Sequence, residues 1–261
     1  MMFKFGSAAP GADALAHGEG AGDGSSSRTP PQPRPAVELP DILRYVVPMF
    51  AYVSLSGLEG YLPRVNNQAS PLWYPIAYAV KVAIVAALAW WYRWTWRDLR
   101  PLPRIGSLIL AILTGFLVVG LWVGLDHHYP SLPFMSQRAA FDPSLMTNTT
   151  RWWFIAVRLL GLVVLVPLIE ELFWRSFLIR WLIDQDFPRV PIGRVTPVAA
   201  VVSSVLFALA HPEWLPALLT GLLWAWLLWQ TKSLSACVAS HAVANLVLGI
   251  YVIASGDWKY W

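Results

Sequence analysis

The sequence contains one cysteine, Cys237, among its 261 residues, so no disulfide can form within the chain. Cys237 lies in an apolar run, which is typical of a cysteine buried as a small hydrophobic side chain. Charge is also scarce, because Asp, Glu, Lys and Arg supply 13% of the residues, against about 25% in a soluble domain. With 57% hydrophobic residues and a mean hydropathy of +0.51, the composition excludes an ordinary soluble domain.

Three other features are missing from the sequence. No cluster of Lys and Arg is interleaved with aromatic residues, so nucleic acid is not an expected partner. Residues 1–40 lack the apolar core of a signal peptide, so we expect no cleavage there. The apolar runs do not alternate with polar residues as the strands of a membrane β-barrel do. We therefore expect the chain to cross the membrane as helices.

The chain has instead a series of long apolar runs, several of which approach the roughly 20 residues that span a bilayer. Its 16 tryptophans fit the aromatic belts found at membrane interfaces. We predict an all-α fold, a multi-pass transmembrane helical bundle of about seven spans with a membrane-embedded polar cavity. The expected spans cover approximately residues 42–62, 73–94, 105–125, 152–182, 196–211, 214–230 and 234–254.

Composition divides the chain into two parts. Residues 1–40 are rich in Gly, Ala, Ser and Pro and are predicted to form a disordered N-terminal tail, because they cannot bury a core. Residues 41–261 are predicted to form an integral membrane domain.

Basic residues gather on one side of the predicted spans, and the positive-inside rule assigns that side, with the N-terminus, to the cytoplasm. They are Lys4, Arg28, Arg34, Arg44, Arg93, Arg97, Arg100, Arg104, Arg180, Arg189, Arg194 and Lys232.

Three charged residues interrupt the predicted span at 152–182. A charge at the bilayer centre costs about 2.5–3.5 kcal/mol, and such residues are functional by default. Glu171 and Arg175 are four residues apart on one helix face, with the acid N-terminal, which favours an ion pair. Glu170 lies about 100° away around the helix, which nominates it as the carboxylate that performs chemistry. The alternative is a structural ion-pair network between helices.

Two later spans carry a polar pair at the same spacing. Phe207 and His211 share one helix face, as do His241 and Asn245. Taken alone, each pair is compatible with a structural role, such as an Asn that bridges to a neighbouring helix.

Taken together, these residues are the groups that activate water. A Glu can serve as a general base, and an Asn amide can donate to a developing oxyanion. Two His and a carboxylate also match a catalytic zinc set, so zinc stays open as a cofactor, with Glu170, His211 and His241 as its ligands. The sequence lacks His-Glu-x-x-His, so no zincin helix supports a metal.

The ordered set of motifs resembles the CAAX prenyl endopeptidase and bacteriocin-processing family of intramembrane proteases, the CPBP or ABI family. The motifs lie within residues 150–250 of this chain. Earlier residues, 45–63 and 73–88, are similar to the bacterial CAAX-protease-related subgroup found with exosortase systems, which implies a bacterial inner membrane. The motifs are Glu170-Glu171-x-x-x-Arg175, Phe207-x-x-x-His211 and His241-x-x-x-Asn245.

This resemblance implies a helical bundle with a conical, membrane-embedded cavity. It implies an endopeptidase whose Glu170 and His211 activate water, with His241 and Asn245 binding the water or the oxyanion. The implied substrate is a membrane-associated protein or peptide, with or without a lipid modification. The supporting residues are Glu171, Arg175 and Phe207. The sequence leaves the oligomeric state open.

One condition must hold for these residues to form one site. His211 lies at the outer end of its predicted span, whereas Glu170 and His241 lie deeper. The site assembles only if the helix that ends near His211 is short and ends within the bilayer. If it does not assemble, the alternative is a non-proteolytic membrane scaffold, such as an immunity or assembly factor. A transporter is disfavoured because the sequence shows no internal repeat.

Two other polar groups are expected to be structural. Lys81, inside the second predicted span, is expected to pair with Glu59 or to extend to an interface. Asp126, His127 and His128 follow the third predicted span, and we expect a solvated loop there rather than a metal site.

Overall fold

The computed structural model describes residues 37–65, 68–132 and 141–260. Residues 1–36 of the tail that is predicted to be disordered lie outside the described residues, so their disorder stays a prediction.

The described chain is helical, which confirms the predicted all-α class. Between α4 and α6 the chain continues without a break through two π-helical segments, η4 (Gly161–Leu165) and η5 (Leu172–Leu178). A short antiparallel pair, β1 (Arg64–Val65) and β2 (Gln68–Ala69), was not predicted. The α-helices are α1 (Leu39–Leu58), α2 (Trp73–Trp91), α3 (Ile105–Gly124), α4 (Asn148–Leu160), α5 (Val166–Glu171), α6 (Ile179–Ile183), α7 (Pro197–Leu209), α8 (Trp214–Thr231) and α9 (Leu234–Ser255).

Each predicted span coincides with a helix, but the predicted number of seven crossings is not confirmed. Within the described ranges, four helical segments are long and apolar enough to cross a membrane. Helix α7 has only 13 residues, or about 20 Å, which is less than the roughly 30 Å of a bilayer core. The four long segments are Trp73–Trp91, Ile105–Gly124, Asn148–Ile183 and Leu234–Ser255.

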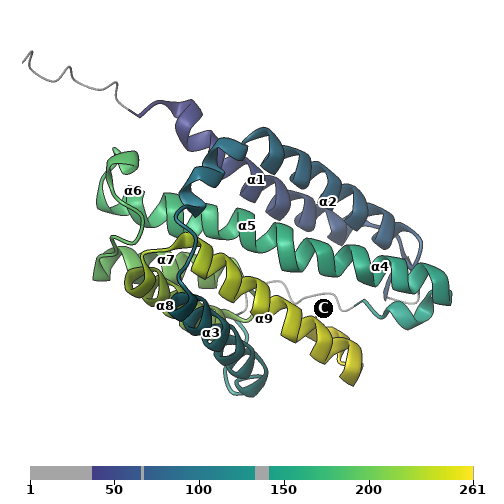
Figure 1. Ribbon diagram of the computed structural model, residues 1–261. Helices are drawn as coiled ribbons and strands as arrows, with labels where there is room; N and C mark the ends of the chain where they lie inside the picture. Colours follow the sequence, from purple (N-terminus) through teal and green to yellow (C-terminus); the bar gives the residue numbers. More distant parts are fainter. Residues whose placement is uncertain (1–36, 66–67, 133–140, 261) are drawn as a thin grey trace, which may run out of the picture. The chain divides into compact units, whose positions relative to one another are not determined.

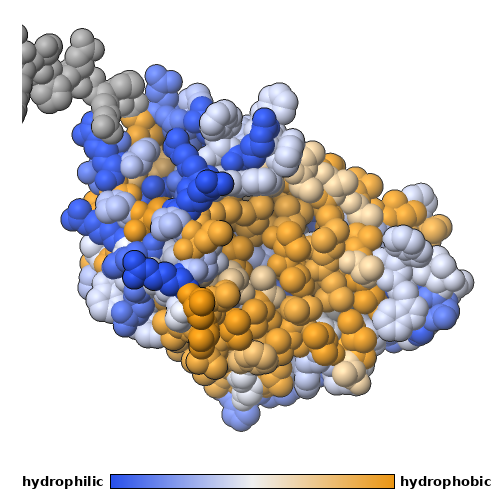
Figure 2. All heavy atoms as spheres, viewed as in Figure 1, coloured by the Kyte–Doolittle hydropathy of each residue, from blue (hydrophilic) through white to orange (hydrophobic). Residues whose placement is uncertain are grey.

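The helices pack as neighbouring pairs around the long α4–α6 segment. Helix α1 packs on α2, α3 on α9, and α7 on α8, and the α4–α6 segment runs between the first pair and the others (Figure 1). Figure 2 shows a broad apolar face with polar residues gathered at one end of it. Helix α3 contributes exposed Ile109, Leu113 and Phe116 to the apolar surface. An apolar surface of this kind fits lipid, and the protein is an integral membrane protein.

Two glycines allow close helix approach. A Cβ at Gly115 of α3 would lie 2.7 Å from the Ser240 carbonyl oxygen and 2.9 Å from a methyl group of Val243 on α9. A Cβ at Gly221 of α8 would lie 2.8 Å from the Cβ of Ser204 on α7. These contacts set the distance of α9 from α3 and of α8 from α7, as small residues do in membrane bundles.

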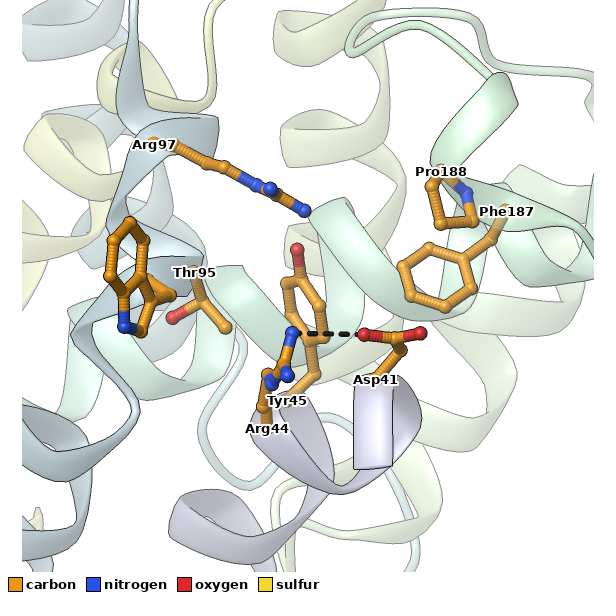
Figure 3. Close-up of a pocket in the computed structure, with 8 residues that line it drawn as sticks. Asp41, Arg44, Tyr45, Thr95, Arg97, Phe187 and Pro188 are labelled. Carbon is orange, nitrogen blue, oxygen red and sulfur yellow. Dashed lines mark hydrogen bonds and ion pairs between the residues drawn. The ribbon is translucent and has the colours of Figure 1, made fainter. Parts of the chain in front are cut away.

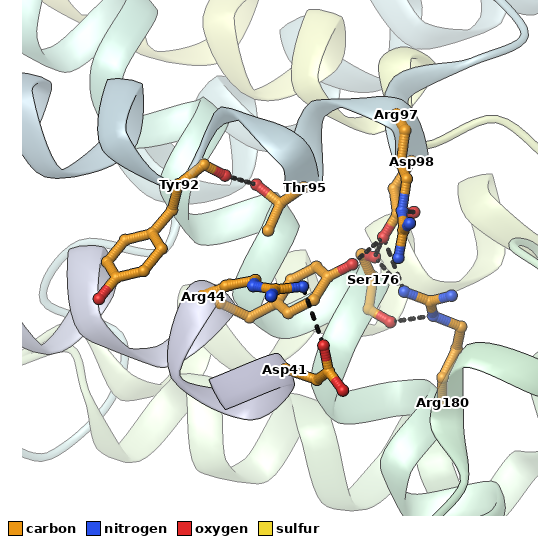
Figure 4. Close-up of polar contacts among 9 residues, drawn as sticks. Asp41, Arg44, Tyr92, Thr95, Arg97, Asp98, Ser176 and Arg180 are labelled. Carbon is orange, nitrogen blue, oxygen red and sulfur yellow. Dashed lines mark hydrogen bonds and ion pairs between the residues drawn. The ribbon is translucent and has the colours of Figure 1, made fainter. Parts of the chain in front are cut away.

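A buried polar cluster ties the helices together at the end that carries the basic loops. The Asp98 carboxylate accepts hydrogen bonds from Tyr45 of α1 at 2.6 Å, Ser176 of η5 at 2.5 Å and Arg180 of α6 at 2.7 Å (Figure 4). A pocket beside this cluster has a volume of only about 20 Å³ (Figure 3). That volume holds little more than one water molecule, so this pocket is too small for a peptide substrate.

Candidate active site

A cavity of about 910 Å³ lies among the helices, and residues of all three predicted motifs line it. Glu170 comes from α5, Phe207 from the last turn of α7, His211 from the turn after α7, and His241 and Asn245 from α9. Helix α7 is short, as the sequence required for one site to form, and His211 lines the same cavity as Glu170 and His241.

The predicted ion pair between Glu171 and Arg175 is confirmed. Arg175 Nε lies 3.2 Å from Glu171 Oε2, and both side chains are buried. The Arg175 guanidinium also lies 4.7 Å from the ring centroid of Phe207 and 5.0 Å from that of Trp224. Aromatic faces and a carboxylate together compensate the cost of burying this cation.

Glu171 has a second contact that the sequence analysis missed. His241 Nδ1 lies 2.9 Å from Glu171 Oε1, and the His241 ring stacks on Trp224 with 4.2 Å between centroids. Trp224 is itself fixed by a 3.0 Å hydrogen bond to Ser240 Oγ. These contacts hold the His241 ring in one orientation. Seventy positions separate Glu171 from His241, so no helical spacing could have indicated the contact.

The ring of His211 is held by the end of the helix that precedes it. Its Nδ1–H donates to the Phe207 carbonyl at 2.8 Å, and the two rings lie 4.4 Å apart. A carbonyl oxygen can only accept, so Nδ1 carries the hydrogen and Nε2 is the basic nitrogen of the neutral ring.

The side chain of Asn245 bridges two helices. Its Nδ2 donates to the Leu162 carbonyl, in η4, at 2.7 Å. In a π-helix each N–H bonds to the carbonyl oxygen five residues earlier, as the Val166 N–H does to Gly161 O. The next donor in this pattern, to the Leu162 carbonyl, would be the N–H of residue 167. That residue is Pro167, which has no N–H, and Asn245 supplies the missing donor. The bridging role left open by the sequence is therefore present, and the amide retains a second N–H.

The sequence left zinc open as a cofactor, with Glu170, His211 and His241 as its ligands. Within residues 37–65, 68–132 and 141–260, no group of three or more His, Cys, Asp or Glu side chains is placed to hold a metal ion. Glu170, His211 and His241 share the cavity without forming a zinc ligand set, so no step is assigned to a metal.

Two groups that were expected to be structural are placed as predicted. Lys81 Nζ lies 2.7 Å from Glu59 Oε1, which confirms that pair. His127 and His128 are exposed, as expected of a solvated loop. Asp126 accepts from Lys259 at 2.6 Å and from the Tyr260 hydroxyl at 2.8 Å. Burial raises the pKa of the Asp126 carboxyl, but these hydrogen bonds outweigh burial and the net pKa is lowered.

Residues 151–247 match the model of one protein family, described as type II CAAX prenyl endopeptidase Rce1-like. The matched segment contains all three motifs that line the cavity. No match was found among curated proteins or among solved structures. The resemblance of residues 45–63 and 73–88 to a bacterial subgroup lies outside the matched segment and stays a prediction.

Proposed function

Because residues 151–247 carry an Rce1-like type II CAAX prenyl endopeptidase domain, we propose that the chain is an intramembrane endopeptidase. It hydrolyses a peptide bond of a membrane-associated protein or peptide with activated water. The observation that carries this proposal is that Glu170, His211, His241 and Asn245 line one cavity of about 910 Å³. A cavity of that size accommodates a short stretch of extended peptide.

In the proposed reaction, Glu170 is the general base. The water oxygen bonds to the carbonyl carbon of the substrate while a proton passes from the water to Glu170. The substrate carbonyl oxygen becomes an oxyanion. The carbon–nitrogen bond then breaks, and the proton passes from Glu170 to the leaving amine. Nε2 of His211 assists by accepting a hydrogen bond from the water, because its Nδ1–H is engaged with the Phe207 carbonyl.

The opposite side of the reacting carbon needs hydrogen-bond donors. With Nδ1 of His241 engaged by Glu171, Nε2 is the ring nitrogen that serves the cavity, where it holds the water or, when protonated, donates to the oxyanion. The second amide N–H of Asn245 is the other proposed donor. Both groups are fixed before the reaction, Asn245 by Leu162 and His241 by Glu171, as oxyanion stabilisation requires.

We also propose that the cavity opens to the non-cytoplasmic side of a bacterial inner membrane. Its lining includes Leu62 after α1, Tyr74 at the start of α2, His211 after α7 and Tyr260 after α9. These are the helix ends opposite the basic loops, and the positive-inside rule assigns those loops, with the N-terminus, to the cytoplasm. The resemblance of residues 45–63 and 73–88 to a bacterial subgroup supports the choice of membrane.

The test compares protein termini in membranes of the native host by mass spectrometry. One strain carries the wild-type chain and another carries Glu170→Gln at equal protein level. We expect a precursor that stays uncleaved in the variant, which identifies the substrate and the cleavage position together. The control is Asp184→Asn, because Asp184 is an exposed acid outside the cavity.

Identical termini in the wild-type and Glu170→Gln strains would contradict the proposal. Retained biological function when Glu170 and His211 are both replaced would favour a non-proteolytic scaffold instead.

A further inference from the structure

Among the described residues, four tyrosines line the cavity, and the hydroxyls of three of them are engaged with the protein. Those of Tyr74 and Tyr78 contact Arg158, at 2.6 Å from its Nη1 and at 3.4 Å from its carbonyl oxygen. The Tyr260 hydroxyl donates to a carboxylate at 2.8 Å. The fourth hydroxyl, that of Tyr52 on α1, makes no hydrogen bond with any residue in the described ranges. A polar group inside a protein needs a partner, so the Tyr52 hydroxyl is left to bind what enters the cavity.

The ring that carries this hydroxyl is held in place. Tyr52 packs against a buried apolar cluster that includes Leu165 and Ile169. On its face lies the ammonium group of Lys81, 4.8 Å from the ring centroid. Packing and this cation–π contact fix the position of the hydroxyl before any ligand arrives, which lowers the cost of binding one.

The Tyr52 hydroxyl lies near the acid that the proposed reaction uses as its base. Ile169, in the cluster under Tyr52, directly precedes Glu170 in the chain. The charges of Arg158, Glu170 and Glu59 act on this hydroxyl, in that order of strength. Helix α5, which carries Glu170, packs against both α1 and α9 (Figure 1). Tyr52 therefore approaches Glu170 from the α1 side, whereas the proposed oxyanion donors come from α9.

We propose that the Tyr52 hydroxyl donates a hydrogen bond to a main-chain carbonyl oxygen of the peptide substrate, beside the bond that is cleaved. This inference rests on the proposed function and adds a substrate-binding residue outside the three motifs. A peptide whose reacting carbonyl reaches the donors on α9 crosses Glu170 and brings a neighbouring peptide group toward α1. A neutral hydroxyl suits a carbonyl oxygen, which is also neutral and is present at every residue. The bond thus places the peptide over Glu170 whatever its side chains are.

The experiment uses the purified full chain in nanodiscs of phosphatidylcholine. The parent probe is a short acetylated peptide that contains S-farnesylcysteine, and mass spectrometry identifies the cleaved bond. In each further probe, one other peptide group is replaced by an alkene, which has no carbonyl oxygen. We measure kcat and KM for the wild type, for Tyr52→Phe and for the control Tyr78→Phe. The control removes a hydroxyl from a second tyrosine of the same cavity, one that already bonds to the protein.

Loss of one hydrogen bond to a neutral acceptor should lower kcat/KM roughly 3- to 10-fold. We expect that loss for Tyr52→Phe on the parent peptide, mainly as a higher KM, because the neighbouring carbonyl does not change charge during the reaction. One alkene peptide should show the same loss with the wild type and no further loss with Tyr52→Phe. Tyr78→Phe should respond to each alkene as the wild type does.

This coupling between one hydroxyl and one carbonyl is an effect that a merely structural role of Tyr52 would not produce. Both substitutions keep the aromatic ring, and thermal unfolding verifies that the variants are folded. Equal kcat/KM for Tyr52→Phe and the wild type, or additive effects at every peptide position, would overturn the proposal.

A parent peptide that the wild type does not cleave would count against the proposed function for such peptides. Binding of the same probes to Glu170→Gln protein, with and without Tyr52→Phe, then decides the role of Tyr52 separately. An affinity that depends on the hydroxyl only when one particular carbonyl is present supports the proposal. Equal affinity with and without the hydroxyl, or no binding at all, overturns it.

Discussion

His241 Nδ1 lies 2.9 Å from Glu171 Oε1, and the other oxygen of that carboxylate lies 3.2 Å from Arg175 Nε. One buried acid thus links a histidine of the cavity to a cation on its own helix. Adjacent Glu170 lines the cavity, so two neighbouring acids of the same sequence motif have different surroundings.

Replacement of Glu171 by Gln should lower stability before it affects chemistry. The change leaves the buried Arg175 cation without its carboxylate, and the loss of one partner of a buried ion pair costs about 3–5 kcal/mol. We expect a lower unfolding temperature and folded yield in detergent. The double variant Glu171→Gln/Arg175→Gln should recover part of the loss, because it removes both charges. A double variant less stable than the sum of the single changes would contradict the pairing.

The bond between Asn245 and Leu162 predicts a coupling with Pro167. Asn245→Ala leaves the Leu162 carbonyl without its donor, at a cost of about 1–3 kcal/mol. Pro167→Ala restores an N–H at the position from which the π-helical register would supply that donor. Asn245→Ala should therefore cost less stability in the Pro167→Ala background than in the wild type. Thermal unfolding of the four proteins measures this coupling, and additive effects would contradict it.

Helix approach at Gly115 should control the position of His241. Gly115→Ala forces a Cβ to within 2.7 Å of the Ser240 carbonyl oxygen, so α9 must move away from α3. We expect a loss of about 1–3 kcal/mol in stability and a lower cleavage rate. The control is Gly120→Ala on the same helix, where a Cβ would have no neighbour within 4 Å. If both variants behave alike, close approach at Gly115 is not what fixes α9.

The proposed orientation can be tested by cysteine labelling in intact cells. Arg64→Cys lies near the cavity mouth and Arg189→Cys lies in a basic loop, and both positions are exposed. Native Cys237 is fully buried and should not react. A membrane-impermeant maleimide should label position 64 in intact cells and position 189 only after permeabilisation. The reverse pattern would place the cavity mouth on the cytoplasmic side.

The sequence predicted helices well because apolar runs and their polar boundaries are local features. The expected spans at 73–94 and 234–254 correspond to Trp73–Trp91 and Leu234–Ser255. The π-helical segments were not predicted, because a change from i+4 to i+5 hydrogen bonds depends on packing partners elsewhere in the chain. The number of membrane crossings was also beyond prediction, since a helix such as α7 is apolar but too short to cross.

The candidate site was predictable as a set of residues but not as a set of contacts. Spacing indicated the pair Glu171–Arg175, since helix periodicity relates positions four apart. It could not indicate that Glu171 also contacts His241 or that Asn245 contacts Leu162, because those contacts join separate helices. Their roles in catalysis remain predictions for the experiments above.

The shortness of α7 also bears on how a hydrolase inside a membrane obtains water. The helix covers about 20 Å of a hydrocarbon layer about 30 Å thick, and the chain then turns at residues 210–213. Backbone groups in such a turn need protein or water as partners, because lipid offers no hydrogen bonds. His211 and Pro212 of this turn line the cavity, so in the proposed hydrolase the hollow that shelters the turn would also supply the water that reacts.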